Sequence, residues 1–199
     1  MTDVLNLRSL LGMARATVMD PQGGGRVILD TARGMPAGAV WLCFSIIIVG
    51  SLIMGELASL MLGPLDDGPL TGQPTLVMGL VQAASLFLVV HAITHIGRLF
   101  GGQGEFLGAL ALMTWLQFVF LLVQVVMLLT TLVLPPLGAI VMTLALGLFL
   151  WLFLNFIAVL HGFQSLGAVF VMTLVSFIAI IFVISLVLSL LGIVTVEPT

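Results

Sequence analysis

The sequence predicts an all-α, polytopic membrane protein with five transmembrane helices and an N-terminal amphipathic helical segment. Of the 199 residues, 61% are hydrophobic and 7% are charged, whereas a soluble domain carries about 25% charged residues. Five apolar runs each exceed the roughly 20 residues that cross a 30 Å hydrocarbon core. Apolar and polar residues do not alternate within these runs, which excludes membrane-spanning strands.

Residues 1–36 form the predicted cytoplasmic or interfacial segment. An amphipathic helix is expected over residues 3–19, because five apolar residues follow the spacing of one helical face: Val4, Leu7, Leu11, Ala14 and Val18. Arg8 and Arg15 flank this stripe. Their long stems can run along lipid while the guanidinium groups reach phosphate.

Asp20 and Pro21 are expected to end this first helix, because proline disfavours helical backbone in the residue before it. The three glycines at 23–25 then predict a flexible break. A short second helix is expected over residues 26–33.

The transmembrane bundle is predicted over residues 37–193. Its spans are expected at about 37–62, 75–96, 106–134, 137–160 and 166–192. Residues 63–74 form a loop without a basic residue, and Pro135-Pro136 makes a tight break between two spans. The first apolar run is longer than the roughly 7–15 residues of a signal-peptide core, so we expect no cleavable signal peptide.

Small and polar side chains within the spans are expected to hold the helices together. Ser51, Gly55 and Ser59 repeat a small residue at every fourth position, which lets a neighbouring helix approach closely. Gln117 and Gln124 are expected to form interhelical hydrogen bonds, and Asn155, buried within the fourth span, is expected to contribute to helix packing. Glu56 is the one carboxylate within an apolar run, and it is either a functional acid or an interfacial one.

The arginines predict the orientation in the membrane. Four of the five precede the first span, and Arg98 follows the second. Cytoplasmic loops carry an excess of basic residues, so the N-terminus is expected in the cytoplasm. An odd number of spans then places the C-terminus outside.

The segment between the second and third spans holds the main cluster of polar residues. His91, His95 and Arg98 fall at i, i+4 and i+7, and therefore form one stripe at the inner end of the second span. The run Gly101-Gly102-Gln103-Gly104 predicts a sharp turn with backbone at positive φ. His161 emerges at the same membrane face from the fourth span.

Two interpretations of these histidines remain open. His91 and His95 can share a metal ion, with His161 or Glu105 as a third ligand. Alternatively, they are interfacial histidines that bond to the backbone or to each other. The glycine turn lacks the lysine of a Walker loop and the strand of a dinucleotide fold, and no nucleophile elbow is present. We therefore expect no catalytic residue and no cofactor.

The segment HIGRLFGGQG, from His95 to Gly104, resembles the turn that follows the second span in the Yip family, the Ypt-interacting proteins and their bacterial relatives. The five closely spaced spans and the Asp-Pro pair after the amphipathic helix extend the resemblance to most of the chain. It is carried by Asp20, Pro21, His95, Arg98, Gly101, Gly102 and Gly104. The resemblance implies a five-span membrane protein.

Eukaryotic members of the family bind Rab-type GTPases and act in vesicle traffic between endoplasmic reticulum and Golgi. This chain has a short cytosolic segment, lacks the Asp-Leu-Tyr-Gly-Pro motif and contains no tyrosine. These departures argue against a Rab-type GTPase as partner. The chain resembles a bacterial branch, and its lysine-free, Gly-, Ala- and Leu-rich composition suits a GC-rich bacterial genome.

The sequence thus favours a non-enzymatic inner-membrane protein that binds other membrane proteins, associates with itself, or shapes the bilayer. A net charge of −3 argues against nucleic acid as a partner. One alternative is a small transporter or channel that uses Glu56, although five spans do not divide into two equal repeats. The other is a metal-binding membrane protein that uses the inner-face histidines.

Overall fold

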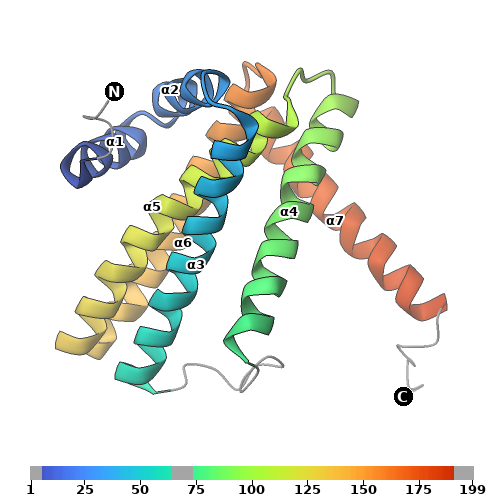
Figure 1. Cartoon of the computed structure of the whole chain (residues 1–199). Helices are drawn as coiled ribbons and strands as arrows, with labels where there is room; N and C mark the ends of the chain where they lie inside the picture. Colours follow the sequence, from blue (N-terminus) through green and yellow to red (C-terminus); the bar gives the residue numbers. More distant parts are fainter. Residues whose placement is uncertain (1–5, 64–73, 191–199) are drawn as a thin grey trace. The chain divides into compact units, whose positions relative to one another are not determined.

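The structure is a computed structural model that describes residues 6–63 and 74–190, with side chains described as far as residue 182. Within these ranges the chain is all-helical, and it divides into two units after Phe163. The first unit contains six helices (Figure 1): α1 (Leu7–Met19), α2 (Pro21–Arg33), α3 (Ala37–Leu62), α4 (Thr75–Leu99), α5 (Phe106–Val133) and α6 (Pro135–His161). The second unit contains α7 (Leu166–Leu190).

Four helices, α3 to α6, are long and apolar enough to cross a membrane, with 25 to 28 residues each. The chain is therefore a multi-pass membrane protein. The predicted fifth span falls on α7, which is also apolar, but the stretch with described side chains, Leu166–Phe182, is shorter than a full span. Residues 191 and 192 of that predicted span lie outside the described residues.

The spans of the first unit begin and end close to the predicted positions. The first agrees with residues 37–62, whereas α4 runs three residues beyond the predicted 96 to Leu99. The predicted tight break at Pro135-Pro136 is confirmed, since α5 ends at Val133 and Pro135 opens α6 after only one intervening residue. Proline suits the first helical position because the missing N–H would have no partner there. Most of the predicted loop at 63–74 lies outside the described residues.

The N-terminal segment is more helical than predicted. Helix α1 begins after Asn6, whose side chain accepts a hydrogen bond from the Arg8 N–H at 3.3 Å. The predicted start at residue 3, and Val4 with it, lies outside the described residues. The Asp20 carboxylate accepts from the Gly23 N–H at 2.9 Å, and Pro21 occupies the first helical position, so α2 starts there.

The prediction of a flexible break at residues 23–25 is therefore wrong. A Cβ on Gly24 would collide with Thr17 of α1, and one on Gly25 would lie 3.3 Å from the Phe156 ring of α6. These glycines allow α2 to approach α1 and α6 closely. Close packing decides the structure here, although glycine has a poor intrinsic helix propensity.

The core of the first unit lies towards one end of the bundle. Helix α5 packs against α2, α3, α4 and α6. Its buried side chains are concentrated in its first half, at Leu110, Leu112, Met113 and Leu116. Leu152 and Phe156, in the second half of α6, are also fully buried. Helices α1 and α2 lie at this same end, as does the last turn of α4 (Figure 1). All five arginines belong to these three helices, so we refer to it as the arginine end.

Candidate functional site

The side chain of His161 occupies the centre of the arginine end, at the last residue of α6. It is 4% exposed. Its Nδ1 accepts a hydrogen bond from the Gly104 N–H at 3.1 Å, and its Nε2 lies 3.1 Å from the carbonyl oxygen of Ile93. Because Nδ1 accepts, the proton of the neutral ring is on Nε2, which donates to Ile93. One imidazole thus joins α6 to both α4 and the turn before α5.

The turn that receives His161 is built by the glycines between α4 and α5. Gly101 has a φ of +85°, which favours glycine. The Gly101 N–H donates to the Arg98 carbonyl at 3.0 Å, and the Gly102 N–H donates to the Gly97 carbonyl at 2.9 Å. This pair of bonds is a Schellman motif, which satisfies the last carbonyls of α4. The predicted sharp turn is confirmed by the positive φ.

Three glycines surround the His161 ring. A Cβ on Gly97, Gly102 or Gly104 would fall within the van der Waals envelope of the imidazole or its Cβ. Arg98 adds a further link, because its Nε donates to the Gly104 carbonyl at 3.0 Å. The glycines of this segment therefore serve two purposes, a left-handed turn at Gly101 and space for an aromatic ring at the other positions.

A polar contact at the buried face of helix α1 links this helix to the bundle. The indole Nε1 of Trp115, on α5, donates to Thr17 Oγ1 at 3.1 Å. Thr17 is 2% exposed, and its hydroxyl donates in turn to the Met13 carbonyl at 2.9 Å. Ala14 is also buried, whereas Leu7 and Leu11 of the same predicted apolar stripe are exposed. The amphipathic helix therefore packs on the protein with one edge and leaves part of its apolar face uncovered.

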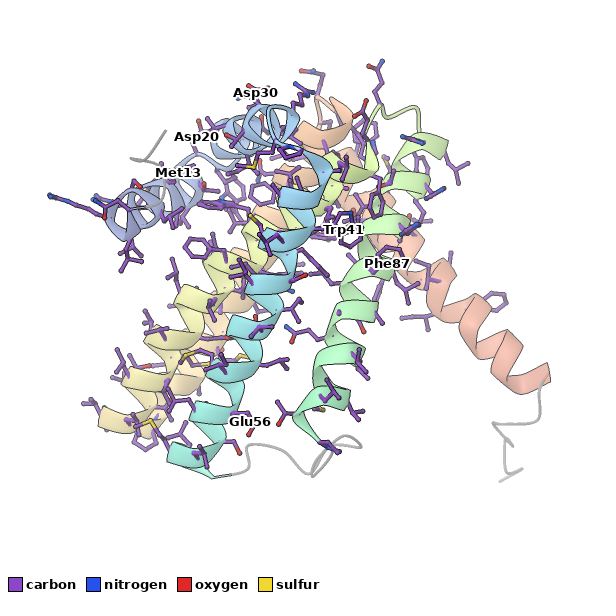
Figure 2. All side chains as sticks on the ribbon, in the orientation of Figure 1. Met13, Asp20, Asp30, Trp41, Glu56 and Phe87 are labelled. Carbon is purple, nitrogen blue, oxygen red and sulfur yellow. The ribbon has the colours of Figure 1, made fainter. Side chains whose placement is uncertain are left out.

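His91 and His95 lie further down α4 in a cluster of aromatic rings. Each Nδ1 lies beside the carbonyl four residues earlier, 3.2 Å from Phe87 and 2.9 Å from His91 respectively. The two rings are stacked at 5.7 Å with 7° between their planes. Phe106 of α5 and Trp41 of α3 complete the cluster. The Trp41 and Phe87 ring centroids are 6.2 Å apart, and Figure 2 labels these two residues on the neighbouring helices α3 and α4.

The geometry of the three histidines does not assemble a metal site. Both ring nitrogens of His161 are within hydrogen-bond distance of backbone partners. Parallel rings at 5.7 Å direct the in-plane lone pairs of His91 and His95 side by side instead of towards one ion. Among the described residues, no group of three or more His, Cys, Asp or Glu side chains is placed to hold a metal. Glu105 precedes α5 at its N-cap position and its side chain makes no capping hydrogen bond.

Glu56 lies at the opposite end of α3 from the arginine end, as the labels of Asp20, Asp30 and Glu56 show in Figure 2. Its carboxylate accepts a hydrogen bond from the hydroxyl of Thr75, the first residue of α4, at 2.6 Å. Both residues line an apolar groove of about 550 Å³. Glu56 is exposed and is not buried inside the bundle. Its hydrogen bond with Thr75 links the end of α3 to the start of α4.

The residues that were expected to mediate helix packing behave in different ways. Ser51 is buried, but Gly55 and Ser59 are exposed, and nothing lies within 4 Å of a Cβ on Gly55. Among the described residues, no neighbouring helix therefore approaches Gly55 closely. The amide of Asn155 is buried but donates to the Trp151 carbonyl of its own helix at 2.8 Å. Two further amides give no interhelical hydrogen bond among the described residues: Gln117, which is half-buried, and Gln124, whose buried Oε1 has no partner.

A comparison with known protein families matches most of the chain. The Yip1 domain matches residues 16–187, from within α1 to within α7. The chain belongs to the Yip1 family. The matched region includes α2 and its Asp-Pro start, the His161 site and all four long apolar helices. No curated protein and no solved structure shows significant similarity to the chain.

The structure also shows which residues of this Yip1 domain the sequence did not reveal. Gly97 was part of the resemblance segment but had no assigned role, and its contact with His161 joins positions 64 residues apart. The bond between Thr17 and Trp115 was likewise not predicted. For Gly97, the sequence did offer one signal. A glycine inside the last turn of an apolar helix often marks a close approach of another part of the chain. Arg98 reaches this site through its bond to the Gly104 carbonyl, and His95 lies on α4 in the aromatic cluster with His91. Asp20 and Pro21 act separately by starting α2.

Proposed function

We propose that this Yip1-family chain is a non-enzymatic, bacterial inner-membrane protein that organises the membrane or binds other membrane proteins through its arginine end. The proposal assigns that role to α1 and α2 as one unit. A Rab-type GTPase is not the proposed partner, because the tyrosine-containing motif is lacking. Other copies of the chain, other integral membrane proteins and the lipid itself are the proposed partners.

The observation that carries the proposal is the uncovered apolar surface of α1 and α2, with α1 bonded to α5 at the arginine end. Leu7 and Met19 of α1 are 65% and 76% exposed, and Val27 of α2 is 52% exposed. Arginines lie beside them on both helices. Apolar side chains next to basic ones are the pattern of a helix that lies in the lipid interface or against a membrane partner. The bond from Trp115 to Thr17 fixes this surface to the bundle.

The proposed topology has five spans, with α7 as the fifth, the N-terminus in the cytoplasm and the C-terminus outside. The gathering of all five arginines at one end supports the orientation, since basic residues accumulate on the cytoplasmic side. Reporter fusions at Met1 and Thr199 test it. Finding both termini on the same side would refute the five-span topology.

Substitution of the exposed apolar side chains tests the role of α1. The Leu7→Asn/Met19→Asn variant is expected to lose co-purifying membrane proteins in mild detergent, or to lose its effect on the curvature of reconstituted liposomes. Met61→Asn is the matched control, because Met61 is 51% exposed but lies at the other end of α3. If the α1 variant and wild type retain the same partners and the same liposome curvature, the proposed role of this helix is wrong.

A further inference from the structure

A groove between α1, α5 and α6 has the composition of a binding site for an amphiphile. Its volume is about 490 Å³, which lies within the roughly 300–1,000 Å³ of small-molecule sites. Twelve residues line it, and eleven of them are apolar. The walls extend over two turns of α5, from Val119 to Val126, and two turns of α6, from Val141 to Leu148.

The one charged residue in the lining is Arg15 of α1. It stands beside Leu11, Ala14 and Val18 on the part of α1 that faces the groove. Arg15 is exposed, and among the described residues no carboxylate forms an ion pair with it. The aspartate nearest in sequence, Asp20, instead caps α2. The groove therefore combines a long apolar wall with one uncompensated positive charge.

We infer that this groove binds one anionic glycerophospholipid, with its phosphate at Arg15 and an acyl chain along α5 and α6. The chemistry of the lining favours this occupant. Both long walls belong to membrane-spanning helices, so the groove is open to hydrocarbon and an acyl chain can enter it from the bilayer. The Arg15 guanidinium provides charge complementarity to a phosphate oxygen. Arg15 also lies at the arginine end, where a phosphate at the membrane surface is within reach of a snorkelling side chain.

A lipid explains the position of Arg15 better than a second copy of the chain does. A helix from another copy would need a carboxylate at the same depth to match Arg15. The four long helices carry a single Asp or Glu, Glu56, which lies at the end of α3 far from the arginines. Phospholipid supplies the required negative charge and the apolar chain in one molecule.

Photolabelling of the full chain tests the inference. The protein is reconstituted in vesicles of equimolar phosphatidylcholine and phosphatidylglycerol. A trace of phosphatidylglycerol that carries a photoreactive group on one acyl chain is added, and in a parallel sample the phosphatidylcholine analogue replaces it. Mass spectrometry is expected to locate more label from the phosphatidylglycerol probe on residues 119–126 and 141–148. Arg15→Gln is expected to lower this preference about fivefold, the factor for one arginine near an anionic surface.

Two pairs of variants separate the groove from general effects. Arg8→Gln removes a positive charge from the same helix but not from the groove, and is expected to leave the preference unchanged. Val123→Trp fills the groove and should reduce labelling by both probes, whereas Val125→Trp, on the exposed side of α5, should not. If Val123→Trp does not fold, Leu144→Trp replaces it, because Leu144 lines the groove and is 69% exposed.

Three results would overturn the inference. The two probes could label the groove equally, which would deny any preference for an anionic headgroup. Arg8→Gln could reduce the preference as much as Arg15→Gln, which would mean that only the overall surface charge attracts the lipid. Finally, intermolecular crosslinks between groove residues, with no lipid label there, would show that a second copy covers this surface.

Discussion

Gly97→Ala is the substitution for which helix propensity and tertiary structure predict opposite results. Gly97 lies in the last turn of α4, and its φ is not in the left-handed region. Alanine in a helix is favoured over glycine by up to about 1 kcal/mol. Propensity alone therefore predicts a more stable protein. In the structure, however, the new Cβ would overlap Nε2, Cε1 and Cδ2 of the buried His161 ring.

The loss of stability is calculated from the interactions that the displaced His161 ring loses. Overpacking of a well-filled core costs about 1–3 kcal/mol. A displaced ring also loses its hydrogen bonds with Gly104 and Ile93, at about 1 kcal/mol each. After the gain in propensity is subtracted, we expect Gly97→Ala to lower the free energy of unfolding by about 2–4 kcal/mol.

Reversible unfolding in detergent micelles, followed by the fluorescence of the three tryptophans, measures this difference. Gly147→Ala is the matched control, because nothing lies within 4 Å of a Cβ at that position of α6. In a His161→Ala background the clash is absent, so Gly97→Ala should cost nothing or stabilise the protein. A Gly97→Ala protein at least as stable as wild type, or an equal cost in both backgrounds, would refute the role assigned to the His161 contact.

Three further predictions concern the ends of the bundle. Thr17→Val keeps the shape of the side chain but removes the acceptor of the Trp115 indole, and should cost about 1–3 kcal/mol and raise the protease sensitivity of α1. The control Thr31→Val should have little effect, because Thr31 is exposed and its hydroxyl donates to the Val27 carbonyl of its own helix. Asp20→Ala removes the N-cap of α2 and should cost about 1 kcal/mol and speed hydrogen exchange at the Gly23 amide, whereas Asp20→Asn should retain most of the stability. Thr75→Val removes the donor to Glu56 and should cost about 1 kcal/mol at most because the pair is exposed, so a loss of several kcal/mol in thermal or chemical unfolding would contradict the described geometry.

Local features of the fold followed from the sequence wherever one helix and its solvent determine the outcome. The first span was predicted at 37–62 and found at Ala37–Leu62, because a run of apolar residues long enough to cross lipid has to form a helix. The turn at Gly101 could also be predicted locally, because a residue with left-handed backbone at the end of a helix is usually glycine. The start of α2 was missed because propensity suggested a break at residues 23–25. Contacts with Thr17 and Phe156 made these glycines part of a helix instead.

The candidate site shows the same division. That His161 lies at the same membrane face as His91 and His95 could be deduced from the order of the spans. That its ring is enclosed by Gly97, Gly102 and Gly104, while the other two histidines stack apart from it, could not. Asn155 is buried, as the sequence led us to expect, but the sequence could not show that its amide donates to the carbonyl of Trp151 on its own helix.

The sequence by itself determined that this Yip1-family chain is helical, that it lies in a membrane, and that its arginines gather at one end. These properties depend on the solubility of each segment and on backbone hydrogen bonds within it, and both are local. Only the tertiary structure decided which glycine faces which ring, which helix the Trp115 indole holds, and that Arg15 borders an apolar groove. Those facts depend on side chains far apart in the chain meeting within a few ångströms, and no periodicity of a single segment encodes that distance.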